Sequence, residues 1–234
     1  YEEISFVGAD KVGFTGVHMG TNGFSPFFPR EKVTVLEKTD QYTILIDEHS
    51  RTIKKRNDET NISIAEYLKF PVTDSKDWED FQHKLNPDTS DRYQNMIIHS
   101  EERDYPVMEQ LSGTYRTLWH LFGDMNLNYV FFDEPDLVHK IMQAWLEMQI
   151  GVIKNIMKVT KINIFAILED MSCNTGMMIS PNLFREFMMP YYKELIAFVK
   201  SYPSVFGVWV DSDGDVRRLI PLLKECGVDG MFPF

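Results

Sequence analysis

The sequence predicts an α/β fold in which parallel strands and helices alternate as in a (β/α)8 barrel, and three observations lead to this prediction. Apolar, strand-like runs near residues 107, 162, 206 and 228 are separated by helical segments, which is the pattern of successive βα units. The second and third of these runs end directly in acidic residues followed by a glycine, as strand tips that carry an active site do. No Gly-x-Gly-x-x-Gly or Walker sequence follows any of the runs, so a doubly wound sheet is the less favoured alternative.

The N-terminal part of the chain lies outside this alternation. Residues 1–29 are rich in glycine and aromatic side chains without a helical period, and they predict a short strand followed by a long loop. Residues 32–56 contain three short β-rich runs and predict an antiparallel meander outside the main sheet. The chain opens on Tyr1 and closes on a strand-like run at 230–234. We therefore expect residues 1–234 to be one barrel domain that is incomplete at both ends.

Apolar side chains at spacings of three and four residues predict the helices. Pro135 follows two acidic residues, and Pro181 follows a serine, so both prolines suit the first turn of a helix. Pro190 should divide the helix in which it lies, and Gly227 should end the last one. The expected helices cover residues 63–70, 76–85, 114–122, 135–158, 181–199 and 219–225.

Composition excludes several classes of protein. Lys and Arg total 24 against 35 Asp and Glu, and the net charge of −11 does not suit a nucleic-acid binder. No apolar run approaches the ~18–20 residues that span a bilayer, so we expect no membrane segment. The two cysteines are too few for a disulfide framework, which favours a cytoplasmic protein.

Carboxylates at the two acidic strand tips are the main candidates for chemistry. Asp211 and Asp213 lie two residues apart and should point the same way, so one of them could orient a substrate or act as a general base. The alternative is that Asp213 or Asp215 only caps the following turn. Glu169 and Asp170 should face opposite ways; we expect Glu169 to reach the cavity, with a salt bridge to a neighbouring strand as the alternative.

Polar residues elsewhere are weaker candidates. Asn174 either binds a substrate oxygen or stabilises the turn before a glycine. His18, beside Met19 in the glycine-rich loop, could bind substrate, move a proton or ligate a metal, although a lone histidine without partners at ligand spacing usually serves as neither proton shuttle nor metal ligand. Cys173 is expected to be a small buried residue, and Cys226 a structural one.

Short segments in the last third of the sequence form a distinctive set. They cover residues 169–171, 174–176, 179–187, 190–193, 211–215 and 227–230. Together they resemble the uroporphyrinogen decarboxylase superfamily, and the similarity extends upstream to about residue 67. This resemblance implies a (β/α)8 barrel. It also implies either a cofactor-free decarboxylase of the porphyrin pathway or a methyltransferase that works with a corrinoid protein.

The sequence is more similar to the methyltransferase-like branch. The acidic tips would repel a substrate with many carboxylates, and the N-terminal part does not resemble the arginine-rich loop of a true decarboxylase. Asp211 stands where many relatives have a histidine, and neither cysteine lies in a His-x-Cys sequence, so the zinc site of the thiol-directed relatives is not expected. The resemblance thus implies methyl transfer between a small methylated substrate and a corrinoid (cobalamin) held by a partner protein, without a tightly bound cofactor or metal. A uroporphyrinogen decarboxylase and a non-catalytic ligand-binding barrel remain alternatives, and a homodimer is left open.

Overall fold

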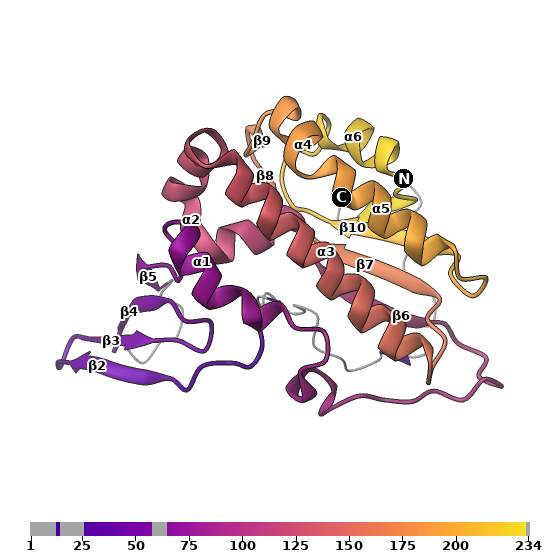
Figure 1. Cartoon of the computed structure of the whole chain (residues 1–234), viewed down its shortest axis with the longest axis horizontal. Coiled ribbons are helices and arrows are strands. Elements are labelled where there is room, and N and C mark those ends of the chain that lie inside the picture. Colours follow the sequence, from indigo (N-terminus) through magenta and orange to yellow (C-terminus); the bar gives the residue numbers. More distant parts are fainter. Residues whose placement is uncertain (1–12, 15–25, 58–64, 233–234) are drawn as a thin grey trace.

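The computed structural model describes residues 13–14, 26–57 and 65–232, and its centre is a five-stranded sheet (Figure 1). The strand order is β1-β6-β7-β10-β11, and every neighbouring pair is parallel. The strands are β1 (Gly13–Phe14), β6 (Val107–Ser112), β7 (Ile164–Leu168), β10 (Gly207–Asp211) and β11 (Gly230–Phe232). The four predicted strands near residues 107, 162, 206 and 228 are therefore confirmed.

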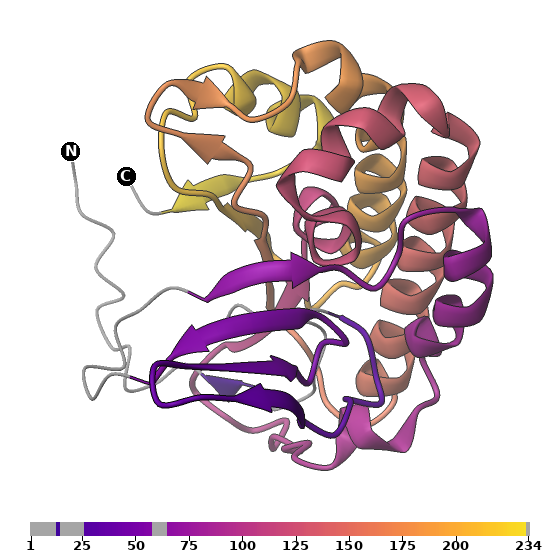
Figure 2. The same ribbon diagram turned by 90° about the vertical axis from the view of Figure 1, so that its left-hand side faces the viewer.

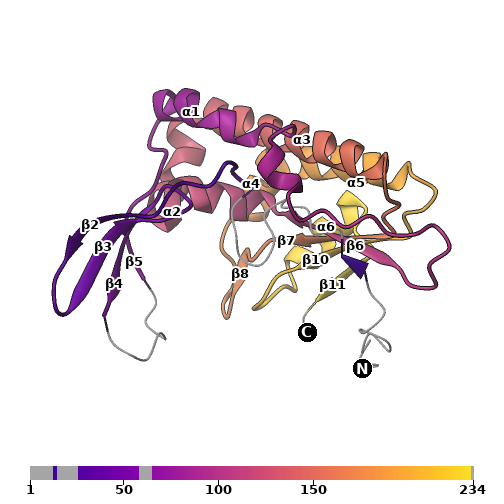
Figure 3. The same cartoon turned by 90° about the horizontal axis from the view of Figure 1, so that it is seen from below.

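Helices cover one face of this sheet (Figure 3). They are α1 (Ser75–Phe81), α2 (Thr114–Asp133), α3 (Pro135–Met157), α4 (Pro181–Phe187), α5 (Met189–Lys200) and α6 (Leu219–Cys226). Short 3-10 helices at Gln82–Leu85 and Ser90–Tyr93 complete the set. Pro190 lies in the first turn of α5 and divides the helical segment as predicted. Gly227, at φ 93°, ends α6 in the left-handed conformation that glycine adopts freely.

Strand order distinguishes the two predicted architectures. In the sheet the order of the strands follows their order in the chain, with β1 and β11 at its two ends. A doubly wound sheet reverses its strand order at a switch point and carries helices on both faces. The observed arrangement is an α/β fold in which helices cover one face of a parallel sheet. The described strands do not close into a barrel.

The two faces of the sheet carry different side chains. Phe165, Ile167, Val208 and Val210 belong to the large apolar core shared with the helices. Alternate residues form a second cluster on the opposite face, with these members: Met108, Ile164, Ala166, Trp209 and Phe232. Because residues two apart along a strand share a face, Asp211 lies on the same face as Trp209, away from the helices.

The predicted meander is confirmed as an antiparallel sheet. Its strands are β2 (Thr34–Lys38), β3 (Tyr42–Ile46), β4 (Thr52–Arg56) and β5 (Glu66–Lys69). The helix predicted from residue 63 is wrong over the described residues 65–69, because this segment pairs with the edge of β4 and forms β5. Tyr67 then packs edge-on against Trp119 of α2, with ring centroids 5.4 Å apart. Pairing and ring packing outweigh the weak helical preference of so short a segment.

Two arginine–histidine contacts fasten the loops of the meander. Arg51 forms an ion pair with Asp47 at 2.8 Å and donates to Nδ1 of His120 on α2 at 3.2 Å. Arg30 donates in the same way to Nδ1 of His49. Since an arginine can only donate, each histidine accepts at Nδ1 and is neutral, with its proton on Nε2. Burial lowers the pKa of His49 to about 3, and it lowers the pKa of His120 well below its ordinary value.

Candidate active site

The ends of β6, β7 and β10 meet at one edge of the sheet, where α2, the meander and a small hairpin gather (Figures 1 and 2). The hairpin consists of β8 (Ser172–Cys173) and β9 (Gly176–Met177) and was not predicted. It is tied to the segment after β10 because the N–H of Asp215 donates to the carbonyl oxygen of Cys173 at 2.9 Å. The carboxyl edge of the parallel strands thus carries the acidic segments, as the sequence predicts.

Glu169, directly after β7, holds the first turn of α2. Its carboxylate accepts the backbone N–H groups of Thr114 at 2.9 Å, Tyr115 at 2.6 Å and Arg116 at 3.2 Å. The side chain is fully buried, and burial raises its pKa to about 7 against the opposing effect of these N–H donors. Gly113 is required here, since a Cβ atom would lie 2.2 Å from the carboxylate. Glu169 therefore positions α2, and its catalytic role stays a prediction.

Asp170 has an unusual backbone and a charged partner. Its φ of 50° places a non-glycine residue in the left-handed region, and its carboxylate forms an ion pair with Arg116. The N–H of Asp170 lies 3.4 Å from the carbonyl oxygen of Asp211, which also accepts the N–H of Glu169 at 2.9 Å. Strained conformations of this kind persist where surrounding contacts fix them, and they concentrate at functional sites.

Among the acids at this edge, Asp211 is the one best suited to proton transfer. It is half-buried, and the pKa of its carboxyl is raised to about 6 by burial, then by the nearby charges of Asp170 and Asp213. Arg116 opposes this rise. Asp213 itself is exposed, whereas Asp215 is paired with Arg217 at 2.7 Å, which agrees with the alternative that Asp215 stabilises the turn. Asp211 and Asp213 are therefore brought together as predicted.

A pocket of about 190 Å3 opens beside these acids. Its lining residues are Tyr115, Arg116, Trp119, Glu169, Asp170 and Met178. From the sequence, Tyr115, Arg116 and Trp119 are predicted only as part of the helix over residues 114–122. Their position directly after the end of β6 was the signal for a site residue, because the same strand-end argument that selected Glu169 and Asp211 applies there.

The remaining candidates lie apart from the pocket or outside the described residues. Asn174 is exposed at the tip of the β8–β9 hairpin, and His18 and Met19 lie outside the described residues. Cys173 is exposed, so the expectation that it is buried is wrong; it sits at the edge of the hairpin. Cys226 is buried as expected, and burial raises the pKa of its thiol to about 12.

The thiol of Cys173 is more acidic than an ordinary cysteine thiol. A hydrogen-bond contact with the Thr175 hydroxyl at 3.2 Å lowers the pKa of its exposed thiol.

Across residues 13–14, 26–57 and 65–232, no group of three His, Cys, Asp or Glu side chains is arranged to hold a metal ion. Within the same residues no helix has the length and apolar character needed to cross a membrane.

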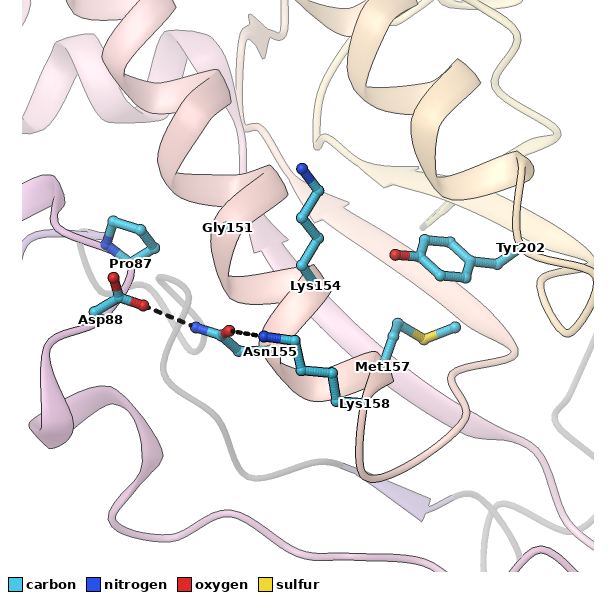
Figure 4. Close-up of a pocket in the computed structure, with 8 residues that line it drawn as sticks. All are labelled: Pro87, Asp88, Gly151, Lys154, Asn155, Met157, Lys158 and Tyr202. Carbon is cyan, nitrogen blue, oxygen red and sulfur yellow. Dashed lines mark hydrogen bonds between the residues drawn. The ribbon is translucent and has the colours of Figure 1, made fainter.

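A second, more open groove of about 410 Å3 lies at the opposite end of the sheet, around the last turns of α3 (Figure 4). Lys158 donates to Asn155, which in turn donates to Asp88, both at 3.1 Å. Tyr202 points its hydroxyl toward the Lys154 side chain in this view. The positive charge of a lysine in the last turn of a helix interacts favourably with the helix dipole, so these lysines have a structural role. The pocket at the carboxyl edge is the candidate active site.

Comparison with known proteins identifies the family of the chain. Residues 70–232 match the family model described as uroporphyrinogen decarboxylase (URO-D). A solved structure of a methyltransferase from Methanosarcina mazei is similar with a TM-score of 0.47 and 13% sequence identity. That similarity covers 72% of this chain, which spans only about half (49%) of the length of the methyltransferase. No curated protein matches the sequence. Since the family model covers well over half of the residues, the chain belongs to the uroporphyrinogen decarboxylase (URO-D) family.

Proposed function

We propose that this member of the URO-D family is a methyltransferase that moves a methyl group between a small methylated substrate and a corrinoid protein. The observation that carries the proposal is the half-buried carboxyl of Asp211, whose pKa of about 6 lies close to neutral pH. An acid of this strength suits proton transfer to or from a reacting atom. We further propose that the complete protein closes into the (β/α)8 barrel of its family.

The charges at the site support a small methyl donor over a porphyrin precursor. Asp170, Asp211 and Asp213 stand near one another, and Arg116 is the basic residue among the pocket lining. A substrate with many carboxylates would be repelled by such a cluster. The pocket volume of about 190 Å3 lies below the ~300–1,000 Å3 of sites for drug-sized ligands, so it suits a small molecule.

In the proposed reaction Asp211 acts as a general acid. As the bond between the methyl group and its heteroatom breaks, the Asp211 carboxyl gives its proton to that heteroatom and becomes a carboxylate. The demethylated product leaves with this proton, and solvent returns a proton to Asp211. A corrinoid on the partner protein would supply the acceptor for the methyl group. Tyr115, Trp119 and Met178 would hold the apolar part of the donor.

The test is methylation of free cob(I)alamin by the full-length protein, followed spectrophotometrically with methoxylated aromatics, methylamines and betaines. We expect turnover with one donor class and its loss in Asp211→Asn. Asp40→Asn is the matched control, because Asp40 is exposed in the turn between β2 and β3. Silence across the panel together with turnover of uroporphyrinogen would refute the proposal in favour of the decarboxylase.

A further inference from the structure

We infer that Arg116 determines which ligands the pocket accepts: its guanidinium donates to an acceptor oxygen on a small apolar ligand and excludes cationic ligands of similar size. The inference deepens the proposed function, because it takes the pocket to be the substrate site. It narrows the substrate to molecules that offer an uncharged oxygen, such as an ether, beside an apolar body. Methylammonium compounds are thereby excluded.

The hydrogen bonds of Arg116 leave most of its donors available. A guanidinium carries several N–H groups in a fixed fork, and the side chain uses Nη1 for its ion pair with Asp170. Its Nε atom is buried and has no hydrogen-bond partner among the described residues. A buried donor of a charged group that lacks an acceptor is unfavourable, and ligands or water commonly satisfy it. The side chain as a whole is 18% exposed and lines the pocket, so a ligand oxygen there could accept from guanidinium N–H groups that the ion pair leaves open.

The other walls of the pocket define the rest of the ligand. Tyr115, Trp119 and Met178 present aromatic and thioether surface. Aromatic faces alone would attract a cation. Here, however, a cation would also lie beside the positive charge of Arg116. Of the two carboxylates that line the pocket, Asp170 is paired with that charge and Glu169 is bound to N–H groups of α2, while Asp211 and Asp213 are not among the lining residues. An uncharged ligand with an oxygen acceptor matches the combination better than a cation does.

The donors of the guanidinium also select among ligands by their acceptors. An ether oxygen has lone pairs to accept from these donors, whereas a quaternary ammonium has none.

Three probes separate these possibilities: anisole and ethylbenzene, which are closely similar in shape, and the bulkier cation phenyltrimethylammonium. Ethylbenzene replaces the ether oxygen by a methylene, and phenyltrimethylammonium replaces it by a cation. Binding to the full-length protein is measured by titration calorimetry at pH 6, with the amide signals of Tyr115 and Trp119 locating the ligand by NMR. We expect anisole to bind about 10-fold or more tightly than either other probe, as a hydrogen bond to a charged donor gives.

Variants test whether Arg116 is the cause. In Arg116→Met we expect anisole and ethylbenzene to bind equally and phenyltrimethylammonium to gain affinity, a reversal that a merely structural arginine would not produce. In Asp170→Asn, which breaks the ion pair but keeps the guanidinium, the preference for anisole over ethylbenzene should remain. Arg217→Met is the matched control, because that side chain is 87% exposed. Circular dichroism checks that each variant is folded.

The inference is overturned if anisole fails to bind, if phenyltrimethylammonium binds as tightly as anisole, or if Arg116→Met leaves the preference unchanged. These results are distinct from failure of the proposed function. Selective anisole binding without methyl transfer to any acceptor refutes only the methyltransferase. Methyl transfer that Arg116→Met leaves unaltered refutes only the role of Arg116.

Discussion

Replacing Glu169 with alanine should destabilise the protein substantially, because its carboxylate holds the start of α2. Three backbone N–H groups at the start of α2 would lose their acceptor, and each buried donor left unpaired costs about 1–3 kcal/mol. Part of this cost is offset, because the pKa of Glu169 rises from 4.5 to about 7 on burial, and removing that buried charge returns about 3 kcal/mol. With each donor near the middle of that range, the expected net loss is about 3 kcal/mol in the free energy of unfolding.

Urea unfolding at pH 7.5, followed by circular dichroism, measures this loss. With a slope of about 3 kcal/mol/M, the midpoint should fall by roughly 1 M. Glu169→Gln keeps one acceptor oxygen and relieves the buried charge, so its cost should be about 1 kcal/mol. Glu194→Ala is the control, since Glu194 is exposed on α5 and should change stability by less than about 0.5 kcal/mol. An alanine variant at position 169 as stable as this control would show that the carboxylate does not hold α2.

Three further predictions concern other parts of the molecule. The pKa of Asp211 is raised to about 6, so activity that needs its acid form should decline as pH rises above 6. In a pH–rate profile, Asp211→Asn should lower kcat about 100-fold or more and abolish this decline. Gly123→Ala should cost about 2–4 kcal/mol in thermal unfolding, because φ is 70° and the new Cβ would lie 2.2 Å from the Phe70 ring; a normal melting temperature would contradict this. Arg51→Met should cost about 3 kcal/mol in urea unfolding by leaving Asp47 buried without its partner, and unchanged stability would show that the pair contributes little.

The sequence predicts the parallel strands well because their signal is local. Each buried strand is an apolar run that the sequence shows directly. Asp213 lies beyond the end of β10, and its charge raises the pKa of Asp211, so the two acids are near each other as predicted. The strand β5 was mistaken for a helix, since a four-residue segment shows too few side chains to reveal its period. Its pairing partner is β4, an earlier segment of the chain, and local patterning does not describe the pairing of separate segments.

Within the site, the roles of the acids depend on partners far away in sequence. Glu169 binds N–H groups 53–55 residues earlier in the chain, so nothing beside it in the sequence shows that a helix start occupies its carboxylate. Arg116 was missed for the corresponding reason. Its importance arises from Asp170, which the fold brings to it from a different strand tip. The sequence therefore predicts that the strand ends carry the site, but it does not predict which of their carboxylates are held by structural contacts.

The arginine contacts of His49 and His120 have a consequence for enzyme kinetics. An inflection near pH 6 in an activity profile is normally attributed to histidine, the side chain that ordinarily titrates there. These two imidazoles are held neutral by donating arginines, with the pKa of His49 at about 3 and that of His120 also far below its ordinary value. His49 therefore stays neutral near pH 6, and the pKa of His120 is shifted in the same direction. An inflection near pH 6 that disappears in Asp211→Asn would therefore belong to a carboxyl group, and the attachment of the meander to α2 would stay the same throughout the titration.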